Sequence, residues 1–156
     1  ADCLDDAAMF HQASPVLLRG IAQHESGMRA NAVNRNANGS EDIGLMQINT
    51  VHLPRLARFG ITRQALFEPC TNAYIGAWIL RENLDRYGPT WDAVGAYNAA
   101  SPDKRLKYIN RIYSTLQRGA PAKPTADSVD HCHLLIQQWT LNTPPPPPLR
   151  GSLTPA

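Results

Sequence analysis

The chain has 156 residues, a length that fits one domain with a sizeable core and excludes two ordinary domains. Hydrophobic residues make up 43% and charged residues 18%, and no run of about eighteen apolar residues exists, which excludes a transmembrane helix. The net charge of +2 is spread along the chain, which excludes a protein that binds nucleic acid by charge alone.

The pattern predicts a mainly α fold whose first clear helix follows Ser14-Pro15, a favoured cap and a residue that suits the first helical position. Gly27 can end this helix. Its inward face is the stripe Leu18, Ile21, Ala22 and Glu25. The Asn- and Gly-rich residues 31–40 indicate a loop or a small hairpin, and no alternating strand pattern is convincing.

Three more helices are expected further along. Thr71 can cap one that stops near Gly88, Thr90 can cap the next, and the last follows Ser101-Pro102. Their apolar residues recur at helical spacing: Tyr74, Ile75, Trp78, Ile79 and Leu84, then Trp91, Val94 and Tyr97, then Leu106, Ile109, Ile112, Tyr113 and Leu116.

Proline use divides the chain. Eight of the 13 prolines lie in residues 121–156, and five of them form the run 144–148. We therefore expect a compact domain over residues 1–118. A linker with room for a short amphipathic helix follows over 119–142, and a Pro-rich polyproline II tail over 143–156.

The three cysteines leave two readings open. A bond between Cys3 and Cys70 would tie the N-terminus to the centre of the fold, as in an exported protein, whereas three free thiols would suit a cytosolic one. Cys132 lies between His131 and His133. Neighbours two apart on a helix point in nearly opposite directions, so we interpret Cys132 as a surface or packing residue and expect no metal.

Two carboxylates are candidates for chemistry. Glu25 continues an inward-facing stripe, where burial would raise its pKa and keep it protonated as a general acid requires. The alternative is a solvated Glu that pairs with Arg29. Asp42 precedes the segment 44–49, which mixes apolar anchors with amides. The alternative for Asp42 is a turn residue that caps the next helix.

A third candidate element is the segment Gly95-Ala96-Tyr97-Asn98-Ala99. Its small residues permit close backbone packing, while Tyr97 and Asn98 offer a phenol and an amide. The alternative is a tightly packed helix with a satisfied core Tyr.

Three motifs occur in order: His24-Glu25-Ser26-Gly27, Gly44-Leu45-Met46-Gln47 and Ala96-Tyr97-Asn98. With them the chain resembles, over about residues 3–116, the lytic transglycosylases of the soluble (SLT, lysozyme-like) type, which cut the glycan strands of bacterial peptidoglycan. The branch it resembles is the small enzymes found with specialised secretion systems and pili. The resemblance implies a single lysozyme-like helical domain.

The chain departs from the family pattern at two positions. Asn34 stands where many members carry a Ser. Asp42 adds a second carboxylate, and residues 42–49 look like the segment of chicken-type lysozymes that carries theirs. The spacing from Glu25 to Asp42 also matches those lysozymes.

The resemblance implies that Glu25 protonates the bond between N-acetylmuramic acid and N-acetylglucosamine and then, as a base, helps to form a 1,6-anhydro product. Asp42 would orient the sugar or add negative charge near C1. No metal or organic cofactor is needed. The expected substrate-binding residues are Asn34, Ser40, Gln47, Asn49, Tyr97 and Asn98.

Two alternatives remain. The first is a hydrolytic, lysozyme-type muramidase that uses Glu25 and Asp42. The second is a non-catalytic glycan-binding module in a secretion machine, although such a module need not keep an acid.

The expected partners are peptidoglycan strands and, through the C-terminal region, secretion-system or pilus proteins, without nucleic acid or a membrane span. We expect a monomer in the periplasm or exported from a bacterium, its signal peptide removed before Ala1. This location favours a Cys3–Cys70 disulfide with Cys132 free.

Overall fold

The computed structural model describes residues 3–98 and 102–118. The helices of this part are α1 (Cys3–Phe10), α2 (Pro15–Ser26), α3 (Leu53–Ala57), α4 (Pro69–Tyr87), α5 (Trp91–Gly95) and α6 (Pro102–Arg118). Three short strands, β1 (Val33–Arg35), β2 (Glu41–Ile43) and β3 (Ile48–Asn49), and two 3-10 turns, η1 (Thr50–His52) and η2 (Gln64–Phe67), lie between α2 and α4. The predicted linker and tail, with Cys132, fall outside the described residues.

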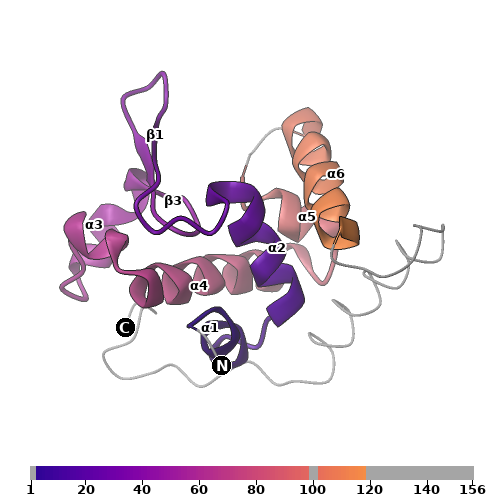
Figure 1. Ribbon diagram of the computed structural model, residues 1–156, viewed down its shortest axis with the longest axis horizontal. Helices are drawn as coiled ribbons and strands as arrows, with labels where there is room; N and C mark the ends of the chain where they lie inside the picture. Colours follow the sequence, from indigo (N-terminus) through magenta and orange to yellow (C-terminus); the bar gives the residue numbers. More distant parts are fainter. Residues whose placement is uncertain (1–2, 99–101, 119–156) are drawn as a thin grey trace.

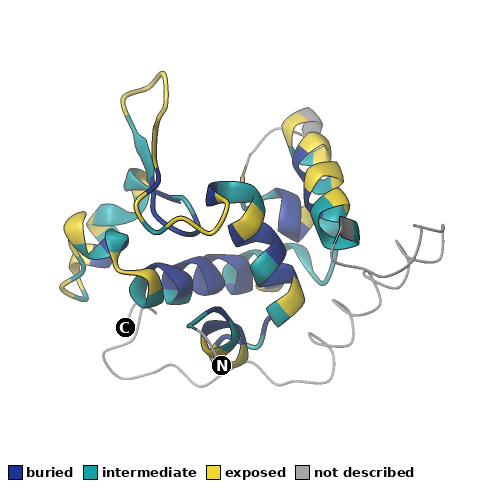
Figure 2. Ribbon diagram, viewed as in Figure 1, coloured by how far each residue is buried: buried dark blue, intermediate teal, exposed yellow. Residues whose placement is uncertain are grey.

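Helix α4 is the central element (Figure 1). It packs against α1, α5 and η2, while α2 packs against α1 and α6. Apolar residues occur on every side of α4, as expected for a core helix, and Ile75, Trp78 and Leu80 are buried. Figure 2 shows α4 buried over most of its length and the tip of the β1–β2 hairpin exposed. No helix in the described ranges is long and apolar enough to cross a membrane.

Helix α2 forms as its sequence predicts. The Ser14 hydroxyl accepts a hydrogen bond from the amide of Leu17 at 3.3 Å, and Pro15 occupies the first turn. Gly27 ends the helix with a φ of 61°, a left-handed conformation that glycine adopts without steric cost. The inward stripe is also confirmed, because Leu18 and Ile21 are fully buried. The chain therefore delivers Glu25 to the last turn of a firmly capped helix.

The start of α4 differs from the prediction. The cap is Glu68 rather than Thr71: its two carboxylate oxygens accept from the amides of Cys70 at 3.1 Å and Thr71 at 2.6 Å. Pro69 takes the first helical position, which leaves Thr71 inside the first turn. A charged carboxylate that satisfies two free amides at a helix N-terminus is favoured by the helix dipole as well.

Two further predictions near the C-terminal end need correction. Helix α5 ends at Gly95, two residues before Tyr97. Tyr97 is therefore not part of the apolar face of α5, as the prediction had it. Leu106 is 60% exposed, whereas Ile112 of the predicted stripe is fully buried, and Tyr108, which the prediction left out, is buried as well.

The Asn- and Gly-rich segment forms the predicted hairpin, and the sheet that it belongs to was missed. Strand β1 pairs antiparallel with β2, and β2 with β3, so that Asp42 lies opposite Asn34 on one side and Asn49 on the other. Strands of two or three residues are too short to show an alternating pattern. This register collects the amides of the segment around one carboxylate.

Cys3 and Cys70 form a disulfide, with their Cα atoms 5.0 Å apart. The bond joins the first turn of α1 to the first turn of α4, so the predicted pairing is confirmed. Helix α1 itself was not predicted. Its eight residues are held by this bond and by packing on α4 rather than by a strong local signal.

Candidate active site

Glu25 faces a pocket of about 260 Å³ that lies between α2, the small sheet and the segment after α5. Of the predicted site residues, the structure brings together Glu25, Asp42, Gln47, Asn49, Tyr97 and Asn98 in its lining. Ile48, Val51, His52 and Ile79 also line it. Asn34 and Ser40 do not line it and contact residues that do.

Burial raises the pKa of Glu25 from 4.5 to about 7, and the negative charge of Asp42 adds to the rise. The Asn98 amide and the Tyr108 hydroxyl act in the opposite direction. Glu25 thus exchanges its proton near neutral pH. A group with such a pKa can donate a proton at one step and accept one at the next.

Asp42 is held in place by two amides. The amide nitrogen of Asn49 donates to one carboxylate oxygen at 2.9 Å, and that of Asn36 donates to the other at 3.1 Å. Both amide nitrogens also donate to the Ser40 hydroxyl, at 3.1 and 3.0 Å. The Asp42 side chain is therefore fixed beside Glu25 rather than used as a helix cap, and Ser40 supports it from outside the pocket.

The polar atoms of the Gln47 side chain form hydrogen bonds to other residues of the protein. Its amide nitrogen donates to the carbonyls of Ala32 at 3.2 Å and Gly44 at 3.0 Å, and its oxygen accepts from Asn34 at 2.7 Å. Its φ of 55° is left-handed, a costly conformation for a residue with a side chain. The three hydrogen bonds of the side chain stabilise Gln47 in this left-handed conformation. Asn34 is exposed on β1 and braces Gln47.

The three sequence motifs meet at one turn, residues 44–47. The Ser26 hydroxyl donates to the carbonyl of Leu45 at 2.7 Å, and the Tyr97 hydroxyl donates to the carbonyl of Met46 at 2.9 Å. Burial, with the charges of Glu25 and Asp42, raises the pKa of Tyr97 well above its usual value, so Tyr97 remains a neutral donor. These bonds place Glu25 and Asn98 on two sides of the same turn.

Two residues on α4 seat this turn. Asn72 is fully buried: its nitrogen donates to the carbonyls of Ile43 and Leu66 at 2.8 Å, and its oxygen accepts from the amide of Met46 at 2.7 Å. Gly76 leaves room for Met46, whose sulfur would clash with a Cβ at that position. Sequence reasoning missed both residues, and only the Gly inside a helix hinted at a close approach.

Sequence reasoning also missed Tyr108. This residue of α6 is 3% exposed, and its ring packs edge-on against His24 with ring centres 5.3 Å apart. Its hydroxyl interacts with the Glu25 carboxyl and lowers the pKa of that group, and among the described residues it makes no hydrogen bond of full geometry. The position of Tyr108 one helical turn before Ile112 was the available signal.

His52 lines the pocket as a neutral imidazole, since burial and the charge of Arg55 lower its pKa to about 4. It therefore adds no positive charge to the pocket near neutral pH. No group of three His, Cys, Asp or Glu side chains suited to a metal ion occurs within residues 3–98 and 102–118.

Comparisons with known proteins show what the chain is similar to. Invasion protein IagB of Salmonella typhimurium strain LT2 is 41% identical over 123 residues, which cover 76% of this chain and 77% of IagB. Protein IpgF of Shigella flexneri is 46% identical over 118 residues, which cover 72% of this chain and 78% of IpgF.

The fold is similar to that of an inactive mutant of the lytic transglycosylase Slt from Pseudomonas aeruginosa, with a TM-score of 0.53 and 22% identity. That match covers 92% of this chain and 24% of Slt. The family described as "Transglycosylase SLT domain" matches residues 2–115. The chain thus belongs to the transglycosylase SLT domain family, and with that membership it is a lytic transglycosylase rather than a non-catalytic glycan-binding module.

Proposed function

We propose that this protein cleaves the β-1,4 bond between N-acetylmuramic acid and N-acetylglucosamine in peptidoglycan and leaves a 1,6-anhydro end. The observation that carries the proposal is Glu25, a carboxyl that lines a pocket and whose pKa of about 7 suits proton transfer in both directions.

The reaction begins when protonated Glu25 gives its proton to the glycosidic oxygen. The bond from that oxygen to C1 of the muramyl sugar breaks, and positive charge develops at C1. The substrate's own N-acetyl group and the Asp42 carboxylate stabilise this charge. A fixed carboxylate is effective here because little reorganisation is needed as the charge forms.

Glu25, now ionised, acts as the base of the second step. It takes the proton of the C6 hydroxyl on the same sugar, and O6 bonds to C1. The second step returns Glu25 to its protonated form, and no water is consumed. Asn98, which lines the pocket and interacts with Glu25, helps to orient the carboxyl between the two steps.

Hydrolysis is the second candidate, and the position of Asp42 favours it. Asn36 and Asn49 hold this carboxylate at the pocket, where it can stabilise C1 or attack it while water replaces the C6 hydroxyl. Mass spectrometry of digested peptidoglycan separates the two outcomes. Transglycosylation gives products one water lighter than those of hydrolysis.

The substitution Glu25→Gln tests the catalytic assignment. The amide is nearly isosteric but transfers no proton, so we expect a loss of about 10²–10⁴-fold in rate with the fold intact. Glu41→Gln is the matched control, because Glu41 adjoins Asp42 and pairs with Arg63 outside the pocket. A Glu25→Gln enzyme with more than about a tenth of the wild-type rate contradicts the proposal.

We also propose that the enzyme works in the periplasm and opens the wall locally for a secretion or pilus apparatus. The name of the relative IagB, an invasion protein, supports the link to such a system. The Cys3–Cys70 disulfide supports an oxidising compartment. Fractionation of a producing cell, followed by activity measurements on each fraction, tests the location.

A further inference from the structure

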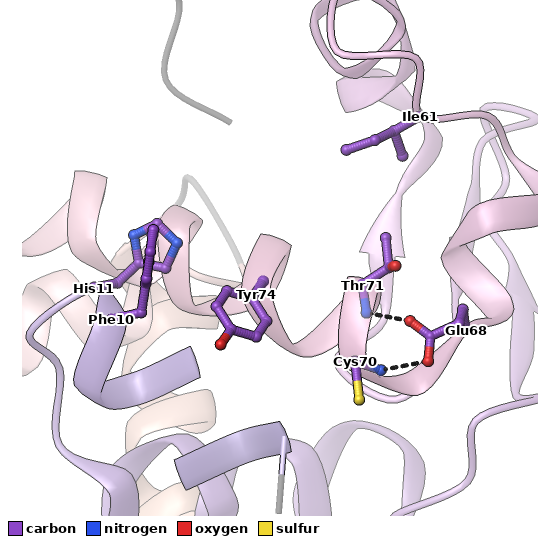
Figure 3. A pocket seen from close by; sticks show the side chains of 7 residues that line it. All are labelled: Phe10, His11, Ile61, Glu68, Cys70, Thr71 and Tyr74. Carbon is purple, nitrogen blue, oxygen red and sulfur yellow. Dashed lines mark hydrogen bonds between the residues drawn. The ribbon is translucent and has the colours of Figure 1, made fainter. Parts of the chain in front are cut away.

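A second pocket lies between the end of α1, the start of α4 and the loop before η2. It has a volume of about 380 Å³, and its surface is mostly apolar. It is lined by Phe10, His11, Ile61, Glu68, Cys70, Thr71 and Tyr74 (Figure 3). None of these residues lines the pocket of Glu25, so nothing in the proposed reaction uses it.

One wall of this pocket is aromatic. The rings of Phe10, His11 and Tyr74 pack edge to face, with centres 4.8 Å apart for Phe10 and His11 and 5.4 Å apart for Phe10 and Tyr74. Phe10 stays 36% exposed. Proline-rich segments in the polyproline II conformation bind to grooves lined in this way, since they present preformed apolar ridges at a small entropic cost.

The pocket carries a single negative charge. Glu68 is exposed, and the hydrogen bonds from the amides of Thr71 and Cys70 lower its pKa, so its carboxylate stays ionised (Figure 3). His11 is neutral, because burial and the charge of Arg81 lower its pKa to about 4. The surface thus pairs aromatic rings with one carboxylate and suits a proline-rich ligand that carries a cation.

The chain itself contains such a ligand. Five consecutive prolines at 144–148 are followed by Leu149 and Arg150, and Arg150 is the one Lys or Arg in residues 143–156. We propose that residues 144–150 of the same chain dock in this pocket. The prolines lie against Phe10 and Tyr74, and the Arg150 guanidinium lies beside Glu68.

The connection is long enough for this contact. Between Arg118, where α6 ends, and Pro144 lie 25 residues, counted as 144 − 118 − 1. They span up to about 80 Å when extended. A domain of this size has a diameter of roughly 35 Å. The tail therefore reaches any face of the domain, and its linkage gives an effective concentration on the order of millimolar.

Docking at this pocket leaves the active site open, because the two pockets share no lining residue. We therefore expect release of the tail to leave turnover on peptidoglycan unchanged. Its effect is on the accessibility of Arg150, which trypsin measures as the rate of cleavage of the bond between Arg150 and Gly151.

The test uses the full chain. Replacing all five prolines of 144–148 by Ser should raise the rate of cleavage after Arg150 about tenfold, as expected if the docked state outweighs the free state by about ten to one. Pro121→Ser is the matched control: it removes a proline upstream of the run, creates no new trypsin site because Ala120 precedes it, and should leave the rate unchanged.

A second pair of variants tests the residues of the pocket. Phe10→Ser should raise the cleavage rate as the proline replacement does, whereas Met9→Ser should not. Met9 is 67% exposed on the same helix and does not line the pocket. Circular dichroism of each variant confirms that the fold is retained.

Magnetic resonance gives a second readout. The proline replacement should shift the ring signals of Phe10 and Tyr74, by the same amount at every protein concentration. Unchanged cleavage and spectra, or shifts only at other sites, overturn the proposal. Shifts that grow with concentration also overturn it, since the occupant is then the tail of a second copy. Shifts seen only on addition of a foreign proline-rich peptide assign the pocket to another protein.

Discussion

At the scale of single residues, the central fact is a partly buried carboxyl, that of Glu25, beside a second one, that of Asp42. Burial and Asp42 both favour the protonated form of Glu25, whose pKa is about 7 rather than 4.5. Such an arrangement serves catalysis and costs stability, since an ionised Glu25 is disfavoured in the folded state relative to the unfolded chain.

The loss of folding stability caused by the raised pKa of Glu25 depends on pH. Because the folded pKa is raised, the folded state binds more protons than the unfolded state between about pH 4.5 and 7, so wild-type stability falls as pH rises through this window. Glu25→Gln lacks this ionisation. It should match the wild type near pH 4 and exceed it near pH 8 by about 3 kcal/mol at most.

Urea unfolding of both proteins at the two pH values measures this difference. An equal gap at pH 4 and pH 8 would mean that Glu25 titrates with an ordinary pKa.

Asp42 carries a prediction of its own. Asp42→Asn removes the negative charge that helps to keep Glu25 protonated, so the pKa of Glu25 falls. The fall of rate with rising pH, which follows the ionisation of Glu25, should move to lower pH, and the maximal rate should drop substantially while glycan binding persists.

A pH–rate profile of Asp42→Asn beside the wild type measures both effects. Glu41→Gln again serves as the control. Superimposable curves of equal height would reduce Asp42 to a structural residue.

At the scale of elements, the turn 44–47 organises the site, and Asn72 on α4 anchors it. Asn72→Ala leaves the carbonyls of Ile43 and Leu66 and the amide of Met46 without their partner. Each buried unpaired group costs about 1–3 kcal/mol, so we expect a loss of at least roughly 3 kcal/mol in the free energy of unfolding.

Asn83→Ala is the control on the same helix. The Asn83 side-chain nitrogen is buried and has no hydrogen-bond partner among the described residues. Its removal should cost much less. Equal losses in thermal unfolding for the two variants would show that Asn72 does not anchor the turn.

The sequence predicts elements where the signal is local. The limits of α2 were predicted correctly from Ser14, Pro15 and Gly27. The cap, the first turn and the end of a helix each depend on residues that are neighbours in sequence. The cap of α4 was misplaced because Glu68 is an uncommon cap and Thr71 a favoured one.

The site shows the same division. The inward stripe made Glu25 a candidate, and the three ordered motifs, through the family resemblance, predicted its role together with those of Gln47 and Tyr97. Tyr108 was missed because its importance arises only when α6 packs on α2 and brings its ring to His24, 84 positions earlier, counted as 108 − 24. Asn72 was missed because a fully buried amide has no distinct pattern in the sequence.

At the scale of the whole molecule, one covalent bond ties the N-terminus to the central helix. The bond between Cys3 and Cys70 closes a loop with a sequence separation of 67. The chain-entropy view gives such a loop roughly 4 kcal/mol of stabilisation. Reduction should therefore lower the unfolding temperature.

Thiol counting checks the bond directly. The chain has three cysteines, so denatured but unreduced protein should show one reactive thiol, from Cys132, and reduced protein three. A Cys132→Ser variant should show none before reduction. Three reactive thiols before reduction would refute the disulfide and remove the main support for an oxidising compartment.

The turn that joins the three motifs depends on segments of the chain that are synthesised at different times. Tyr97 donates to Met46 across 51 positions, and Asn72 supports the same turn across 26. A chain delivered from its N-terminus presents Glu25 early, but the turn lacks its last support until residue 97 is out. A fragment that ends before Tyr97 therefore lacks this support of the turn, and we expect it to cut no glycan.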